Sequence, residues 1–539
     1  QLHDKDRRNI VSQFRGAVLD ALETNAFFRV QQIFCDFLPL IDDTVENVAA
    51  SVRALVSKAQ GDLAGSRPNV AFLQWCRQTA DRAREGIDLV EARPTDDLGV
   101  TSFILQAGFD HDPKAYVAKA IGMTKNEHQH IRYAAMTALG RMALNGAKTL
   151  ETQTLDTLED IIRTNRSPVE TAIALDATLS LLKANPGVVS KKATQLLKLA
   201  SGHASPNLRY ICSQALFFNR QELEDEAINV VLDILSKTPR EETGAIENID
   251  VALSNWDLSG DRERIFGFIR ALMSGREQAV DIVALDSFLH SMRSGPAPRA
   301  AWFVASLLLT GDHRLCTAAS VIAQNEEAHG EFDLDLTAFG LNDAWLLYFA
   351  QKAAGYLTLH PRVLLGMLVS ACRAAGVQTA DMIADIIFDP LLLNYGSIEA
   401  NLARLAAVSD ARIKRVLRRV LRRYKSNRDD LKRVGVVAEF RPTDRELHLE
   451  WEHQKDFWRE VNKAAEQQSV FMSIMPKSIL LYGSHAVIYV YRDAASPPVR
   501  TEMELKGQSM SFEMPALSTL MPVGLSYRTF LFRNATRPE

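Results

Sequence analysis

The chain has 539 residues, of which 47% are hydrophobic and 24% are charged, and its formal net charge is -4. This composition is typical of a folded protein and excludes an intrinsically disordered one, and the length exceeds what one compact core supports. The longest nearly uninterrupted apolar run, residues 300–309, is about half as long as a bilayer-spanning helix, so no membrane span and no membrane partner is predicted.

Apolar residues recur at helical spacing from near the N-terminus to about residue 425, interrupted by short turns rich in Gly, Pro and Ser. This pattern predicts an all-α region. We divide the chain into an N-terminal helical region (1–110), helical repeats ending in a basic helix (111–435) and a C-terminal α+β module (436–539).

Two segments of the middle region align without gaps. HIRYAAMTALGRM (130–142) and NLRYICSQALFFN (207–219) share Arg, Tyr and Ala-Leu at equivalent positions, 77 residues apart. A third helix of the same phase is expected at Val169, about halfway between them, which gives a unit of about 38 residues. A weaker echo joins Ala174-Leu175-Asp176 to Ala284-Leu285-Asp286. A repeat of two helices predicts an α-solenoid, and an irregular helical bundle is the alternative.

At these residues the chain resembles the HEAT and armadillo-like superfamily, whose second helices carry a pattern like Ile131-Arg132 followed by Ala135 and Ala138-Leu139. The resemblance implies that an Asp in phase with Asp176, Asp250 and Asp286 binds backbone amides in a turn between helices. The predicted fold class is therefore mainly α: an α-solenoid of HEAT-like helical pairs, followed by a small C-terminal β-containing domain.

Residues 410–433 hold eleven basic side chains and three acidic ones in a chain that is otherwise acidic. The apolar residues of this segment fall on one helical stripe, so the arginines fan over the other faces, where like charges repel one another. Something must offset that repulsion, and three candidates stay open: a nucleic acid, an acidic protein partner, or internal acidic stretches such as residues 325–335. The predicted contact residues are Arg412, Arg415, Arg418, Arg419, Arg422, Arg423, Lys425 and Arg428.

The C-terminal region changes character. An amphipathic helix is predicted at 447–467, and we expect Trp451 and Trp458 to pack in a core or against the following module. Short β-branched or aromatic runs then predict strands at 478–482, 486–492, 501–506, 510–514 and 526–533.

The five cysteines lie far apart among apolar neighbours and form no CxxC pair: Cys35, Cys76, Cys212, Cys316 and Cys372. Buried thiols in a reducing compartment are predicted rather than disulfides or a zinc site. The first residues lack the apolar core of a secretory signal. We therefore predict a cytoplasmic protein that needs no metal or other cofactor.

No Gly-rich phosphate loop, HExxH or GxSxG motif occurs in the chain. The best local polar cluster is His448, Glu450, Glu452 and His453, with His485 beyond it, and His448 can meet Glu452 at i+4. A solvated helix face explains this cluster better than catalysis or metal binding. We predict a non-enzymatic scaffold that uses the α-solenoid surface and the basic helix (412–433) to hold a macromolecular partner, with a protein expected first. The alternative is a nucleic-acid-binding accessory subunit of a bacterial complex, for example one of genome defence, and an enzyme centred on this polar cluster is a third class.

Overall fold

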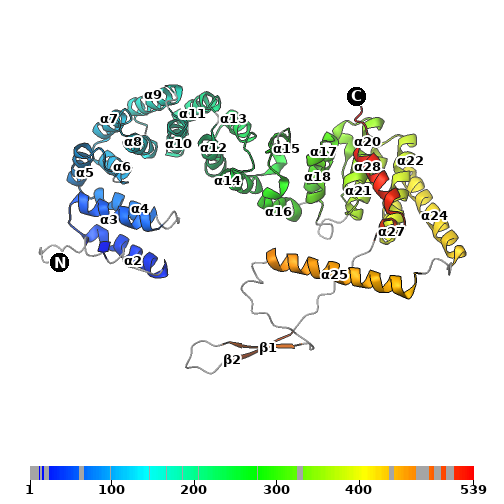
Figure 1. Ribbon diagram of the computed structural model, residues 1–539. Coiled ribbons are helices and arrows are strands. Elements are labelled where there is room, and N and C mark those ends of the chain that lie inside the picture. Colours follow the sequence, from blue (N-terminus) through cyan, green and yellow to red (C-terminus); the bar gives the residue numbers. More distant parts are fainter. Residues whose placement is uncertain are drawn as a thin grey trace. The chain divides into compact units, whose positions relative to one another are not determined.

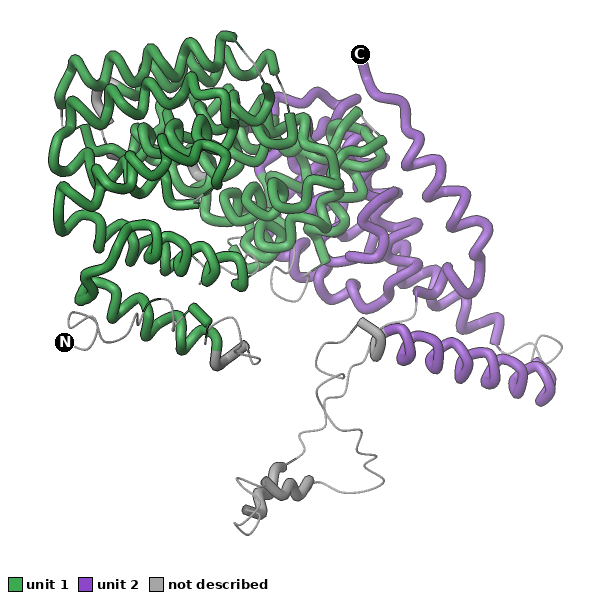
Figure 2. The backbone as a smooth tube through the Cα atoms, turned by 60° about the vertical axis from the view of Figure 1, so that its left-hand side comes forward, with its two compact units in different colours: residues 1–334 green, residues 335–539 purple. Residues whose placement is uncertain are grey.

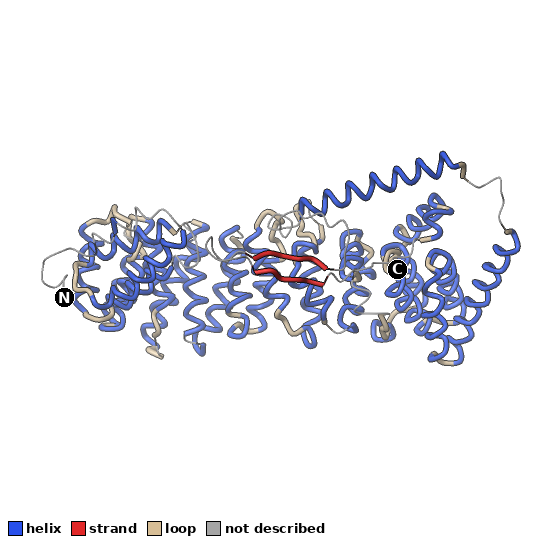
Figure 3. The backbone as a smooth tube through the Cα atoms, turned by 90° about the horizontal axis from the view of Figure 1, so that it is seen from below, coloured by secondary structure: helices blue, strands red, loops and turns tan. Residues whose placement is uncertain are grey.

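A computed structural model gives the fold, and Figure 3 shows that it is mainly α-helical. The structure describes residues 11, 15–16, 24–59, 66–97, 99–144, 146–164, 167–184, 186–203, 205–275, 277–295, 297–324, 332–435, 442–468, 485–490, 499–504 and 515–539. These residues form two compact units, 1–334 and 335–539 (Figure 2).

Unit 1 is a run of helices joined by short turns (Figure 1). They are α2 (Thr24–Phe37), η1 (Leu38–Leu40), α3 (Val45–Lys58), α4 (Arg67–Cys76), α5 (Ala80–Ala92), α6 (Thr101–His111), α7 (Pro113–Met123), α8 (Gln129–Arg141), α9 (Lys148–Thr164), α10 (Pro168–Ala184), α11 (Pro186–Ser201), α12 (Pro206–Phe218), η3 (Arg220–Glu222), α13 (Asp225–Leu235), α14 (Thr243–Ser254), α15 (Leu258–Met273), η4 (Ile282–Ala284), α16 (Asp286–Ser294), α17 (Ala297–Thr310) and α18 (His313–Ile322).

Unit 2 continues with helices and ends in a helix that returns to the unit's first one. The elements are η5 (Leu336–Phe339), α20 (Asp343–Tyr356), α21 (Pro361–Ala374), α22 (Val377–Ile386), η6 (Ile387–Leu392), η7 (Gly396–Ile398), α23 (Glu399–Val408), α24 (Ala411–Val434), α25 (Asp444–Gln468), β1 (His485–Val490), β2 (Val499–Glu504), α27 (Ala516–Leu520) and α28 (Pro522–Arg533).

The helices of unit 1 stack in two layers. Each even-numbered helix from α4 to α16 packs on the next even-numbered one, while α7, α9, α11 and α13 pack on one another in the second layer. The predicted repeat is thus confirmed at the level of a helical, solenoid-like stack. Since α8, α10 and α12 lie in register in one layer, the expected helix at Val169 and the 77-residue offset are both explained.

Polar contacts repeat at the same interval as the helices. Arg132 of α8 pairs with Glu170 of α10 at 2.7 Å, and the matching Arg209 of α12 pairs with Glu242, directly before α14. The two arginines that align in the sequence therefore make equivalent contacts: each forms an ion pair with a glutamate of the next repeat. Loss of one member of a buried arginine–carboxylate pair is strongly destabilising, because the other member is left as a desolvated charge without a partner.

Two of the three aspartates expected to bind turn amides do so at the start of α16, Asp286 through the N–H group of its neighbour Ser287 at 2.8 Å. Asp250 accepts the backbone N–H groups of Ser287 and Phe288, at 3.0 and 2.8 Å, and so holds the start of α16. Asp176 lies in the middle of α10, where burial raises the pKa of its carboxyl, and Asp286 is the first residue of α16. The echo between residues 174–176 and 284–286 therefore does not mark equivalent positions.

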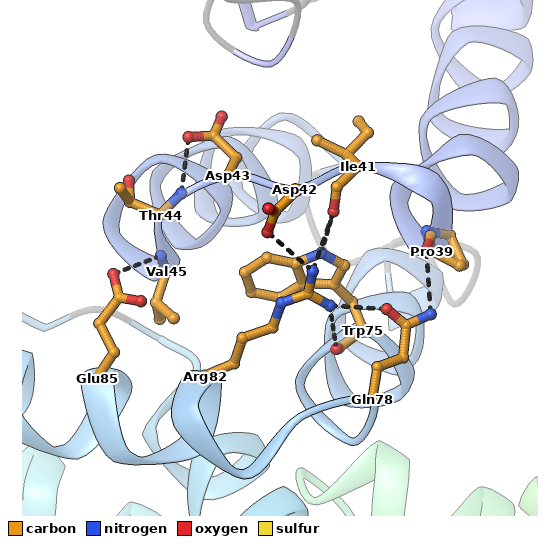
Figure 4. A network of polar contacts seen from close by, with 10 residues as sticks. All are labelled: Pro39, Ile41, Asp42, Asp43, Thr44, Val45, Trp75, Gln78, Arg82 and Glu85. Atoms are coloured by element: carbon orange, nitrogen blue, oxygen red, sulfur yellow. Dashed lines mark hydrogen bonds and ion pairs between the residues drawn. The ribbon is translucent and has the colours of Figure 1, made fainter. Parts of the chain in front are cut away.

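A polar network ties the first helices together (Figure 4). The Arg82 guanidinium lies 4.1 Å from the centre of the Trp75 ring, and it donates to the carbonyl oxygens of Trp75 at 2.9 Å and Ile41 at 3.3 Å. Trp75 Nε1 donates to the same Ile41 oxygen at 2.8 Å. These contacts join α4 and α5 to the turn that precedes α3.

The prediction of a C-terminal β domain is not supported. Residues 526–533, expected to be a strand, lie in α28, and the only strands within the described ranges are β1 and β2, which form an antiparallel hairpin. The expected strands at 478–482 and 510–514 lie outside the described residues.

Tertiary contacts explain why the aromatic run of α28 is helical. Arg533 Nε donates to the Gly355 carbonyl at 2.7 Å, Lys352 Nζ donates to the Arg533 carbonyl, and Arg528 pairs with Asp389. A Cβ at Gly355 would lie 2.9 Å from the Arg533 nitrogen, so α20 and α28 approach closely because position 355 lacks a side chain. The run resembles a strand, but Tyr527, Phe530 and Leu531 also fall at i, i+3 and i+4 of a helix, and here packing on α20 decides.

All five cysteines are buried and free, as predicted. Burial raises the pKa of the Cys76, Cys212 and Cys372 thiols to about 12 and that of Cys35 to about 11, so these side chains act as small apolar core groups. Within the described parts of the chain, no helix combines the length and the apolar character that crossing a bilayer requires.

Candidate functional site

Helix α24 carries the basic residues that stood out in the sequence. It begins at the cap residue Asp410, whose carboxylate accepts the N–H groups of Arg412 and Ile413 at 2.8 and 3.0 Å. Both hydrogen bonds lower the pKa of the Asp410 carboxyl, and the one from the Ile413 N–H has the largest effect. The predicted apolar stripe is buried at Ile413, Val416, Leu417 and Val420, where α24 packs on α22 and α23.

Two arginines at one edge of this buried stripe form ion pairs with carboxylates of the same chain. Arg419 pairs with Asp381, and Arg423 pairs with Asp385 at 2.8 Å, both carboxylates lying one turn apart on α22. The Arg423 guanidinium also lies 3.9 Å from the centre of the Phe388 ring. These side chains serve the contact between α22 and α24.

The two ends of the predicted contact set are also engaged. Arg412 donates to three backbone carbonyls near the C-terminus of α21, those of Cys372, Arg373 and Ala375. A cation is favourable there because the last carbonyls of a helix carry partial negative charge. Arg428 pairs with Glu399 of α23 at 3.1 Å.

Apart from Lys432 in the last turn, the other cations of α24 that form no ion pair with any described residue are Lys414, Arg415, Arg418, Arg422 and Lys425. At 3.6 residues per turn they fall within a sector of about 120° of the helix circumference. The same five residues, with Ala411 and Leu421, line a groove of about 720 Å³. We call this group the unpaired stripe.

Internal pairing therefore accounts for half of the predicted contact residues. Arg412, Arg419, Arg423 and Arg428 contact other groups of the same chain, so they are weaker candidates for an outside partner than the other four. Arg415, Arg418, Arg422 and Lys425 stay available. Most of the acidic segment 325–335 lies outside the described residues, and the carboxylates that pair come instead from α22 and α23.

Sequence reasoning missed Lys414, although its spacing from Arg418 places the two on one face. It also missed Asp381 and Asp385. A signal was present, because each aspartate precedes its arginine by 38 residues, which is the length of one repeat unit. Pairing across neighbouring repeats is what a stack of like units produces.

The polar cluster of α25 does not assemble into a site. His448 Nε2 lies 3.5 Å from Glu452 Oε1, as its spacing predicted, but both side chains are exposed. Glu450 and His453 are exposed on other faces of the helix. His485 is the first residue of β1, a strand that the structure describes by its backbone alone. No group of three or more metal-ligating side chains occurs among the described residues.

The α25 tryptophans are not core residues, which corrects one of the two expectations for them; docking against the following module stays a prediction, because most of 469–514 lies outside the described residues. Trp451 and Trp458 are 57% and 47% exposed. A capping box stabilises the N-terminus of α25: Thr443 N donates to Glu446 Oε2 at 2.7 Å, and Glu446 N donates to Thr443 Oγ1 at 3.3 Å.

Comparison with known proteins gives little further information. No protein-family model and no curated protein matches the chain. Among solved structures, the chain is similar to an engineered protein known from a crystal structure, with 14% sequence identity, a TM-score of 0.20, and coverage of 78% of this chain and 99% of that chain. Similarity at this level carries no argument about function.

Proposed function

We propose that this protein is a non-enzymatic binding protein that holds an acidic macromolecular partner through the unpaired stripe of α24. One observation supports this most strongly: neighbouring arginines of the same helix are matched with carboxylates, whereas the stripe is not. Repulsion between like charges at i and i+4 destabilises a helix by a few tenths of a kcal/mol per pair, so an unmatched row is a cost that a bound polyanion would offset.

The rest of the chain would then act as the support that presents this surface. We propose that its helical pairs are of the HEAT kind, on the strength of the matched Arg132 and Arg209 pairs and of Asp250 at the start of α16. Long stacks of this type expose extended surfaces and commonly serve as scaffolds. A cytoplasmic location belongs to the same proposal and rests on the five free thiols.

Charge reversal of the stripe tests the proposal. We would measure binding of the full chain to three labelled polyanions, namely duplex DNA, single-stranded DNA and polyglutamate, by fluorescence anisotropy. The test variant is Arg415→Glu, Arg418→Glu, Arg422→Glu and Lys425→Glu. The matched control changes four exposed lysines of unit 1 to glutamate, none of which forms an ion pair with any described residue: Lys114, Lys125, Lys148 and Lys191.

Both variants lower the net charge by the same amount, so a general loss of positive charge affects them equally. We expect the stripe variant to lose at least 100-fold in affinity, since each lost phosphate or carboxylate contact weakens binding and each new carboxylate repels the ligand. The control should retain its affinity within about threefold. Failure of the unmodified protein to bind any of the three polyanions would contradict the proposal, as would equal losses in the two variants.

Removing the internal carboxylates should have the opposite effect. The double variant Asp381→Asn and Asp385→Asn releases Arg419 and Arg423 beside the stripe and removes two negative charges. Both ion pairs are largely exposed, so we expect a stability cost of only about 1 kcal/mol in total. Affinity for the polyanion should rise several-fold at 100 mM salt; an unchanged or weaker affinity would show that charge at this edge of α24 does not govern binding.

A further inference from the structure

We infer that the partner of the unpaired stripe is the sugar-phosphate backbone of a nucleic-acid duplex, contacted without reading its bases. This inference rests on the proposed function and specifies its ligand. It follows from what the stripe contains, from what it lacks and from its length.

The stripe lacks the apolar centre that a protein partner requires. Protein interfaces place apolar and aromatic side chains at their core and have few charged residues there. The groove is lined by the five cations and by only two apolar residues, Ala411 and a half-buried Leu421. The exposed apolar side chains of this helix, Leu431 and Val434, lie in the last turn, on the side that continues the buried stripe. A surface of cations alone suits a ligand that offers mainly charge.

The stripe also lacks the groups that bind single strands or read bases. Single-stranded nucleic acids are held by aromatic side chains that stack on the bases, and no aromatic residue falls in this sector. Tyr424 lies next to the buried side, within reach of the Arg428 guanidinium, which is 5.8 Å from its ring centre. Asparagine and glutamine, which recognise adenine, are absent from the sector as well.

The length of the stripe fits a short stretch of duplex. Lys414 and Lys425 are separated by about 16 Å along the helix axis, at about 1.5 Å per residue. A duplex presents a phosphate charge about every 1.7 Å of its axis, so the stripe can follow about five base pairs. Asp429 follows Lys425 by one turn on the same face and separates these five cations from Lys432 in the last turn of the helix. Three of the five cations are arginines, whose planar guanidinium groups grip phosphate with paired hydrogen bonds.

The salt dependence of binding tests this inference in the full chain. We would measure the affinity for two 20-base-pair DNA duplexes of unrelated sequence between 50 and 200 mM NaCl. If five cations each displace a counterion, the slope of log affinity against log salt is about -4.5, which corresponds to a loss of several hundred-fold over this range. The two duplexes should bind within about threefold of each other.

Two variants of the same helix form a matched pair. Arg418→Gln with Arg422→Gln removes two residues of the unpaired stripe, and Arg419→Gln with Arg423→Gln removes two paired residues at the same i, i+4 spacing. We expect the first variant to make the slope shallower by about 2 and the second to change it by less than about 0.5. Circular dichroism and thermal unfolding of both variants show whether α24 remains folded.

The outcomes separate this inference from the proposed function. Binding of polyglutamate through the stripe without binding of duplex DNA would overturn the inference and leave the proposed function standing, whereas binding of neither would overturn both. Tighter binding of single-stranded than of duplex DNA, a difference above about tenfold between the two duplexes, or equal slope changes in the two variants would each overturn the inference alone.

Discussion

Replacing Arg132 by alanine is expected to lower the stability of the α8–α10 region by about 3 kcal/mol, because it leaves a buried carboxylate without its partner. Glu170 has only 5% of its side chain exposed, and both Nε and an Nη of Arg132 donate to it, at 2.8 and 2.7 Å. The same guanidinium also donates to the carbonyl oxygens of Asn126 and Glu127 in the turn before α8.

Hydrogen exchange of the amides of α8 and α10 measures this effect locally, which matters because a chain of this size need not unfold in one step. Arg163→Ala is the control, since Arg163 is 67% exposed and pairs with Glu159 on the surface, where loss costs about 0.5 kcal/mol or less. Adding Glu170→Gln to Arg132→Ala should recover part of the loss. A decrease below about 1 kcal/mol for Arg132→Ala would mean that this pair does not hold the repeats together.

Substituting Gly140 by alanine is the second change with a large expected effect. A Cβ at this position would lie 2.5 Å from the Ala177 Cα and 2.8 Å from its carbonyl oxygen, so α8 and α10 would have to separate. Overpacking of this kind costs about 1 to 3 kcal/mol, and it outweighs the gain of up to about 1 kcal/mol from a better helix former. We expect a net loss of about 2 kcal/mol in the same exchange measurement.

Gly267 provides the matched control, because it lies within α15 and an added Cβ would meet nothing within 4 Å. Gly267→Ala should stabilise α15 by up to about 1 kcal/mol. A rise in stability for Gly140→Ala, like that expected for Gly267→Ala, would mean that α8 and α10 are not in close contact at this point. It would then also contradict the stacked arrangement of the repeats.

The helical repeat was predictable because it rests on local periodicity and on recurring side chains. Ile131, Ala135 and Leu139 form the buried apolar face of α8, and the same spacing of apolar residues recurs in α12. Arg132 and Arg209 recur because the contact they make recurs. Such features depend on residues close in sequence or one repeat apart.

The errors arose where distant contacts decide. The run at 526–533 alternates like a strand, but its helical form depends on Gly355 and Lys352, more than 170 residues earlier. The division of α24 into paired and unpaired cations depends on Asp381 and Asp385, which a count of local charge does not include. For the candidate site, therefore, the sequence located the helix, and the choice among its arginines needed a comparison of charges one repeat apart, 38 residues earlier in the chain.

The reactivity of individual lysine amines tests the role of the unpaired stripe most directly. Lys414 and Lys425 lie in the stripe, whereas Lys148 and Lys191 are exposed on α9 and α11 of unit 1. We would acetylate the full chain briefly, with and without saturating duplex DNA, and quantify each lysine by mass spectrometry. The proposal predicts that duplex DNA reduces acetylation of Lys414 and Lys425 at least fivefold and leaves Lys148 and Lys191 unchanged; unchanged acetylation of Lys414 and Lys425 under saturating conditions would contradict it.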